Sequence, residues 1–301
     1  MLPFLLNLLG VDFGSHGREF NAADALRMDN GKVIDAMHYT LSGSFTHTIL
    51  EWSAFCTAVF SVTLSFIYFY FRRDPVTPII GVALFFAGCM DAFHTLASDR
   101  LIYGVADNQS LIPFTWVICR LFNALILIGG AAMFLNTKPE RLNRGVGFIA
   151  IVSLFCSFVA YGIIYICAHS TNLPTTIFPE SIMRRPWDVV PLFLFIVAGT
   201  IVFPKLYYKY PSFFSGALLV SVIPQIATQG FAGAISGDFL EQAQLHMVFG
   251  STALFDNDFN IAHFLKIVAY LVPVSGLVLD YILLSLQFRR SAQKIGLDAL
   301  S

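Results

Sequence analysis

The sequence predicts an all-α protein, a polytopic membrane helical bundle with seven transmembrane helices. Two observations predict this class. Of the 301 residues, 56% are hydrophobic and only 12% are charged, with a mean hydropathy of +0.71, whereas a soluble domain carries about twice that charged fraction. The apolar residues also come in runs long enough to cross the hydrocarbon core of a membrane, which takes about 20 helical residues. The short alternating segments of a membrane β-barrel do not occur in the sequence.

Seven apolar runs mark the expected helices in chain order. Each run has about the length of a spanning helix, and Pro and Gly interrupt the runs as membrane helices tolerate. The runs cover residues 47–71, 76–97, 111–135, 146–168, 187–205, 212–235 and 260–288. They define three regions: an extracytoplasmic N-terminal segment over residues 1–44, a seven-helix membrane domain over 45–290, and the start of a cytoplasmic helix or linker over 291–301.

Lys and Arg are distributed unevenly between the loops, and this distribution predicts the orientation, because cytoplasmic loops carry an excess of both residues. One set of loops contains Arg72, Arg73, Lys138, Arg141, Arg144, Lys205, Lys209, Arg289, Arg290 and Lys294. The opposite set contains only Arg18, Arg27, Lys32, Arg100, Arg184 and Arg185. We therefore expect the N-terminus outside and the C-terminus in the cytoplasm. Trp52, Trp116 and Trp187 then lie near the outer ends of spans, as an aromatic belt predicts.

The charge balance and the cysteines exclude two broad classes of function. A net charge of −1 excludes a general nucleic-acid role, which requires a basic surface. The five cysteines all lie within spans and form no Cys-x-x-Cys pair. They are therefore expected to be small packing residues, not a disulfide framework or a thiolate metal site.

Ionisable side chains lie at the same end of three spans, where such groups are costly and seldom without a role. His47 and Glu51 open the first span at i, i+4 spacing and share one helix face. Asp91 and His94 close the second span at i, i+3 spacing, as carboxylate and His ligands do in metal-binding helical bundles. His263 opens the last span. The orientation puts all five at one depth on the outer side, where we expect them to line one pocket.

Three further side chains are expected to support this pocket. Asn260 shares a helix face with His263, and Lys266 lies one turn deeper. Arg120, in the third span, has the depth of both carboxylates and is a natural charge partner for one of them. Imidazole and carboxylate together suit zinc, iron, copper or nickel, so a transition metal or haem is expected. A pocket for a small polar ligand or a proton is the alternative, and each residue taken singly also fits a packing role or a structural ion pair.

Three patches of the sequence carry a resemblance to a known family. They are His47 to Glu51 ahead of an aromatic-rich span, residues 88–97 (GCMDAFHTLA), and residues 260–270 (NIAHFLKIVAY). These resemble the His-x-x-x-Glu, Asp-x-x-His-Thr-Leu-Ala and Asn-x-x-His-x-x-Lys motifs of the bacterial membrane-associated sensor domains, in particular the third type of the MASE group. Arg120 also falls where that family tends to have Arg. The resemblance covers about residues 45–290 and leaves the first 44 residues unmatched.

The resemblance implies a sensory input domain in the bacterial cytoplasmic (inner) membrane. Such domains precede a cytoplasmic output domain of kinase or diguanylate cyclase type, joined in cis or bound in trans, and we expect a homodimer. The final span continues without a break through residues 287–294, so a signal received in the outer pocket would pass along it. Two alternatives stay open, namely a metalloenzyme that activates water or oxygen at a His/carboxylate site, and a transporter with polar residues continuing through the bilayer midplane.

Overall fold

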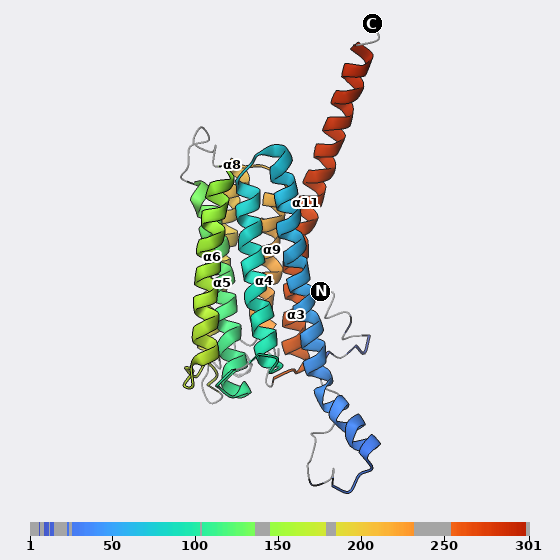
Figure 1. Ribbon diagram of the computed structural model, residues 1–301, viewed down its shortest axis with the longest axis vertical. Helices are drawn as coiled ribbons and strands as arrows, with labels where there is room; N and C mark the ends of the chain where they lie inside the picture. The colour runs from blue at the N-terminus through green and yellow to red at the C-terminus, as the bar shows by residue number, and fades with distance from the viewer. Residues whose placement is uncertain are drawn as a thin grey trace, which may run out of the picture.

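The computed structural model describes residues 26–102, 104–135, 145–178, 185–231 and 254–298, together with isolated residues among the first 25. Within these residues the chain forms helices and connecting turns, without a β-strand, and the helices stand side by side in an elongated bundle (Figure 1). Most of residues 1–25, the end of the predicted sixth span (232–235) and the last three residues of the chain (299–301) lie outside the described residues.

Seven helices among the described residues are long and apolar enough to cross a membrane, as the sequence predicts. The first four are α3 (Asn30–Arg72), α4 (Val76–Ser98), α5 (Asn108–Leu135) and α6 (Val146–His169). The fifth span consists of η2 (Pro186–Asp188), α7 (Val189–Val197), the π-helical turn η3 (Ala198–Val202) and α8 (Phe203–Lys209). The last two are α9 (Phe213–Phe231) and α11 (Asn257–Asp298).

The helix α3 begins well before the predicted start of the first span. The Asp29 side chain accepts a hydrogen bond from the amide of Gly31 at 3.3 Å and caps the helix. No Pro interrupts the chain from Asn30 to Arg72, so the helix runs on for 43 residues. The predicted boundary at residue 45 therefore falls inside one continuous helix. In Figure 1 the first part of α3 projects from one end of the bundle and the last part of α11 from the other.

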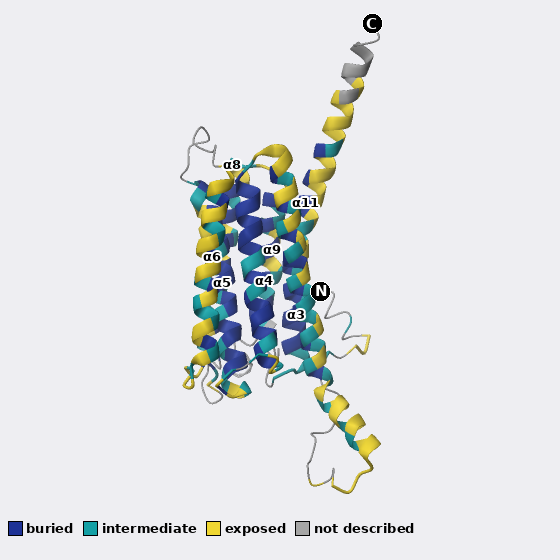
Figure 2. Ribbon diagram, in the orientation of Figure 1, coloured by how far each residue is buried: buried dark blue, intermediate teal, exposed yellow. Residues whose placement is uncertain are grey.

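Six of the seven spans form a closed ring. Neighbours around the ring are α3, α4, α5, the α7–α8 span, α9 and α11, which returns to α3. The remaining helix, α6, packs outside this ring against α4 and α5. Almost every side chain of α4 is buried, whereas α6 is largely exposed (Figure 2). The position of α4 matters because two of the predicted site residues lie on it.

Small residues bring α3 and α4 close together. A Cβ atom built on Gly88 of α4 would lie 2.5 Å from the Cβ atom of Ala58 of α3, so only glycine fits at this crossing. The turn between the helices is short: Arg73 takes a left-handed conformation (φ 57°), and the Asp74 carboxylate accepts from the amide of Val76 at 3.1 Å. This antiparallel pairing sets the part of α3 around Ser44 and Thr48 beside the end of α4, where both side chains donate to Asp99.

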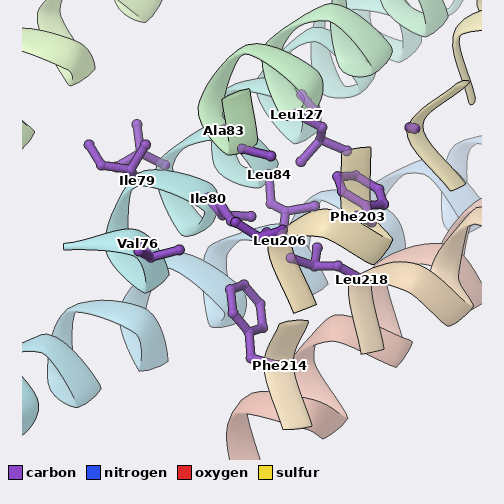
Figure 3. Close-up of a cluster of buried hydrophobic side chains, with 14 of the residues drawn as sticks. Val76, Ile79, Ile80, Ala83, Leu84, Leu127, Phe203, Leu206, Phe214 and Leu218 are labelled. Atoms are coloured by element: carbon purple, nitrogen blue, oxygen red, sulfur yellow. The ribbon is translucent and has the colours of Figure 1, made fainter. Parts of the chain in front are cut away.

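The end of the bundle at which α4 begins is filled by apolar side chains. We call this cluster the apolar half (Figure 3). It includes Val76, Ile79, Ile80, Ala83 and Leu84 of α4, Leu127 of α5, Phe203 and Leu206 of α8, and Phe214 and Leu218 of α9. Membrane helices associate largely through close van der Waals packing of this kind. This packing holds the helices in register and so fixes the positions of the side chains at the other end of the bundle.

Candidate functional site

Three helices bring four potential metal ligands together at the end of the bundle opposite the apolar half. His47 and Glu51 come from α3, His94 from α4 and His263 from α11, and all four side chains are buried. Each offers one nitrogen or oxygen atom, and these atoms all lie within 4.8 Å of one another. We call these four residues the histidine cluster. Its compactness is a property of the fold, since α3 and α11 are far apart in the sequence.

The three imidazoles face one another closely. The ring centroid of His47 lies 4.5 Å from that of His263 and 5.5 Å from that of His94, with the planes nearly perpendicular in both pairs. The rings of His94 and His263 are almost parallel, 6.2 Å apart. Phe259 borders the cluster, with its ring 4.4 Å from that of His263. The nitrogens therefore converge inside an aromatic and apolar wall, away from the surrounding lipid.

Hydrogen bonds fix the tautomers of two of these histidines. Nδ1 of His263 lies 2.6 Å from the carbonyl oxygen of Phe259, which can only accept, so Nδ1 carries the hydrogen. Nδ1 of His94 lies 2.7 Å from Oγ1 of Thr115, and that hydroxyl already donates to the carbonyl of Leu111 at 2.7 Å. Thr115 must then accept from His94. In both rings Nε2 keeps its lone pair, the arrangement in which protein imidazoles bind metal ions.

The remaining polar atoms of the cluster have no hydrogen-bond partner among the described residues. These atoms are both ring nitrogens of His47, Nε2 of His94, Nε2 of His263 and Oε2 of Glu51. Nε2 of His263 lies 3.0 Å from Oε1 of Glu51. A nitrogen lone pair facing a carboxylate oxygen at that distance is repulsive unless a positive charge lies between them. The geometry fits either a metal ion or a proton at this point.

Lys266 and Asp91 lie directly beneath the cluster, one helical turn deeper. The ammonium group of Lys266 donates to Oε1 of Glu51 and, at 3.2 Å, to Oδ1 of Asp91. The hydroxyl of Tyr270 donates to Oδ2 of Asp91 at 2.9 Å. Both carboxyl oxygens of Asp91 are thus hydrogen-bonded below the cluster, and Asp91 is not among the four grouped ligands. Its place is that of a charge partner for Lys266.

The sequence pattern of the MASE3 family, described as a membrane-associated sensor domain, matches residues 40–231 of the chain. This range covers well over half of the 301 residues. The chain belongs to this family. No curated protein and no solved structure matches it. The family resemblance seen in the sequence is confirmed over residues 40–231, and the seven apolar helices fit a multi-pass membrane protein.

The MASE3 match includes some of the cluster and leaves the rest outside. His47, Glu51, Asp91, His94 and Arg120 lie within residues 40–231. The helix α11, with His263 and Lys266, lies beyond that range. The structure nevertheless closes α11 against α3. The MASE3 region supplies three of the four grouped ligands, and the helix that follows it supplies the fourth.

Arg120 of the MASE3 region has a different partner from the one that its depth suggests. Its Nη2 donates to the side chain of Gln225 at 2.5 Å and to the carbonyl oxygen of the same residue at 3.3 Å. Its guanidinium group lies 4.9 Å from the ring centroid of Phe195. Lys266 instead donates to both carboxylates, those of Glu51 and Asp91, because it lies one turn from His263 on α11. Arg120 therefore ties α5 to α9.

Asn260 stabilises the chain above the cluster and does not point at the ligands. Its side-chain amide donates to the carbonyl oxygens of Phe13 at 2.6 Å and Gly43 at 3.0 Å. The amide of Phe13 in turn donates to the side chain of Asn257 at 3.0 Å. Asn260 therefore connects α11 to α3 and to the N-terminal segment.

Three residues at the site were not predicted from the sequence: Tyr270, which donates to Asp91, Thr115 and Trp116. Thr115 orients His94, as described above, and a lone Thr in an apolar span carries no sequence signal. Trp116 was expected in the aromatic belt at the membrane interface, but only 1% of it is exposed. Its ring lies 4.6 Å from that of His263, and the ammonium of Lys266 lies 5.1 Å from the indole centroid. Its spacing of one turn from Arg120 was the available clue that it faces inward.

Proposed function

We propose that this chain is a sensory input domain that binds one divalent transition-metal ion through His47, Glu51, His94 and His263. Zinc, iron or copper suits this set of imidazole and carboxylate ligands. The single observation that carries the proposal is the convergence of four ligand atoms within 4.8 Å of one another. The fixed Nδ1–H groups of His94 and His263 add to it, because metal-binding histidines are oriented in this way.

Compactness and burial favour a bare ion over haem or a larger ligand. All four side chains are closed off from solvent, and their ligand atoms lie at most 4.8 Å apart. A porphyrin would have to separate α3, α4 and α11 to reach any of these nitrogens. Burial also favours sensing over catalysis, since a catalytic metal keeps one coordination position open to substrate. The apolar half disfavours transport, because apolar side chains make up most of its core among the residues that the structure describes.

The relay that we propose runs along α11. In this proposal the histidine cluster lies on the outer side of a bacterial inner membrane and the end of α11 lies in the cytoplasm, an orientation that the Lys and Arg distribution favours. Because α11 carries His263 and continues to Asp298, a change at the cluster moves a helix that reaches a cytoplasmic output domain, of kinase or diguanylate cyclase type, within a homodimer. The ion must bind two arrangements of the bundle unequally, and a tenfold bias requires about 1.4 kcal/mol of differential affinity.

Metal analysis of the detergent-purified chain tests this proposal. We expect one ion per chain, Co²⁺ d–d absorption bands after exchange, and no haem absorption. The variant His47→Ala should lose the ion, whereas His38→Ala should keep it. His38 is the matched control because it lies on the same helix and is exposed, and its ring contacts the carbonyl of Ile34 and the ring of Phe45, which are not part of the histidine cluster. Equal metal content in both variants, or none in the native chain, would overturn the proposed function.

A further inference from the structure

One carboxylate joins the histidine cluster to a buried lysine. Oε1 of Glu51 faces Nε2 of His263 at 3.0 Å and also accepts from the ammonium group of Lys266. Oε2 of Glu51 has no hydrogen-bond partner among the described residues. Lys266 is only 1% exposed, so its charge has no access to water. A metal ion bound by the cluster and the Lys266 ammonium would therefore both interact with the same carboxylate.

A second carboxylate is available to Lys266 without any movement of the backbone. Asp91 already accepts from its ammonium at 3.2 Å. The other oxygen of Asp91 accepts from Tyr270 at 2.9 Å, and the Tyr270 hydroxyl accepts from Asn123 at 3.4 Å. These side chains are all buried and tie α4, α5 and α11 together. Asp91 is thus held in place to receive the ammonium if Glu51 is taken by another cation.

The charges make the two occupants of Glu51 incompatible. Glu51 and Asp91 carry two negative charges, and Lys266 carries one positive charge. With neutral histidines these three side chains together have a net charge of −1, which attracts a divalent cation; the buried guanidinium group of Arg120 stands outside this sum and donates to Gln225. Once such a cation is bound, its charge and that of Lys266 repel each other strongly, because few solvent dipoles screen them there. Either the ammonium retreats from Glu51 or the ion binds weakly.

We propose that Lys266 is a built-in competitor of the metal ion for Glu51, and that it moves onto Asp91 alone when the ion binds. This inference rests on the proposed function and specifies how the site is regulated. In the ion-free state Lys266 links α11 to both α3 and α4. In the ion-bound state His263 holds α11 to α3 through the metal, while Lys266 holds it only to α4. The two states therefore differ in how α11 is attached, which is the difference that a relay along α11 requires.

A double-mutant cycle on metal affinity tests this competition. The variants are Lys266→Met, Glu51→Gln and the combination, in the full chain, with Zn²⁺ binding measured by calorimetry in detergent. Lys266→Met should bind Zn²⁺ on the order of tenfold more tightly, because the competing charge is gone. In the Glu51→Gln background the same substitution should give a clearly smaller gain, because only the repulsion between the two cations is then removed. Lys205→Met, an exposed lysine at the far end of the bundle, is the matched control and should leave the affinity unchanged.

Three other results would each overturn the inference. Weaker Zn²⁺ binding by Lys266→Met would mean that Lys266 positions Glu51 for the ion. An equal gain with and without Glu51 would mean repulsion through space, without competition for the carboxylate. If the native chain bound no Zn²⁺, the proposed function would fail together with the inference. The first two results, in contrast, would overturn the inference alone. The variant Lys266→Met/Asp91→Asn, which restores the charge balance, should show the same gain if the single variant fails to fold.

Discussion

The two ends of the bundle use buried charge in different ways. At the end of the apolar half, charged side chains satisfy helix termini. Asp280 of α11 accepts from the first amides of α9, those of Phe213 at 3.0 Å and Phe214 at 2.8 Å. Lys209 donates to the last carbonyls of α5, those of Phe134 at 2.9 Å and Leu135 at 2.7 Å. At the histidine end Asp256 also caps a helix, accepting from the amide of Phe259 at 2.8 Å, but the fully buried charged groups there face one another and imidazole nitrogens.

This difference separates stability from function within one set of helices. Capping groups and apolar packing at one end lower the free energy of the folded bundle, and they leave no unused polar atom of Asp280 or Lys209 to bind a ligand. The histidine cluster keeps lone pairs without hydrogen-bond partners, which is destabilising in a buried site. The cluster is therefore held by the packing of the other half. Substitutions at the two ends should affect different measurements, and each prediction below tests that separation.

The largest effect is expected from removing one ligand of the histidine cluster. His94→Gln replaces the imidazole by an amide of similar size, and metal affinity should fall on the order of a hundredfold, or about 2.7 kcal/mol. Stability without metal should change by less than about 1 kcal/mol, since Gln can still hydrogen-bond Thr115. Calorimetric titration with Zn²⁺ and thermal unfolding check the two halves of this expectation. An unchanged affinity would remove His94 from the ligand set.

A cavity in the apolar half should lower the stability of the fold and leave the metal affinity unchanged. Leu84 is 1% exposed, and Leu84→Ala should lower the free energy of unfolding by about 2 kcal/mol, through lost packing. Zn²⁺ affinity, measured on the fraction that stays folded, should not change. Leu125→Ala is the control, because Leu125 is 52% exposed toward the lipid and its loss should cost little. A parallel loss of affinity in Leu84→Ala would show that the two ends are not separable.

The fold and most of the cluster could be predicted from the sequence, for different reasons. The spans follow from runs of apolar residues, whose length the membrane dictates. His47 and Glu51 follow from the helical period, and so does the placing of Asp91 with His94 on one face. The prediction that these pairs meet His263 depended on one assumption, that all five residues lie at the same depth in the membrane. The structure fulfils it, because α3, α4 and α11 are neighbours in the ring.

The partners of the charged side chains could not be predicted, because the depth of a residue in the bundle does not determine the direction in which its side chain points. Arg120 lies at the level of the carboxylates, yet its guanidinium group turns to Gln225 on α9. Lys266 reaches both carboxylates because its long stem descends from the helix that carries His263. The early start of α3 was not predicted, since residues 30–44 mix polar and apolar side chains without an apolar run of spanning length, and the Asp29 cap is the main signal for a helix there. Such features depend on tertiary packing and capping, which composition does not reveal.

The hydrogen bond behind His94 should matter for affinity and little for stability. Thr115→Val keeps the shape of the side chain but leaves Nδ1 of His94 without its acceptor. Metal affinity should fall about tenfold, as is typical when such a partner of a metal-binding histidine is removed. Thr57→Val is the matched control, because the Thr57 hydroxyl donates to a carbonyl of its own helix, at 2.7 Å, without touching a histidine. Equal losses in both variants would indicate a general packing effect.

The smallest effect is expected at the cap of α9. Asp280→Asn keeps one oxygen, so it can accept from only one of the two amides and loses the charge that favours a helix N-terminus. The free energy of unfolding should fall by about 1 kcal/mol, whereas Asp35→Asn, at an exposed position of α3, should have no effect. Zn²⁺ affinity should be unchanged in both. If Asp280→Asn altered the Zn²⁺ affinity, the cap of α9 and the histidine cluster would be coupled. The coupling would run through α11, which carries both Asp280 and His263, and the two ends of the bundle would then not be separable.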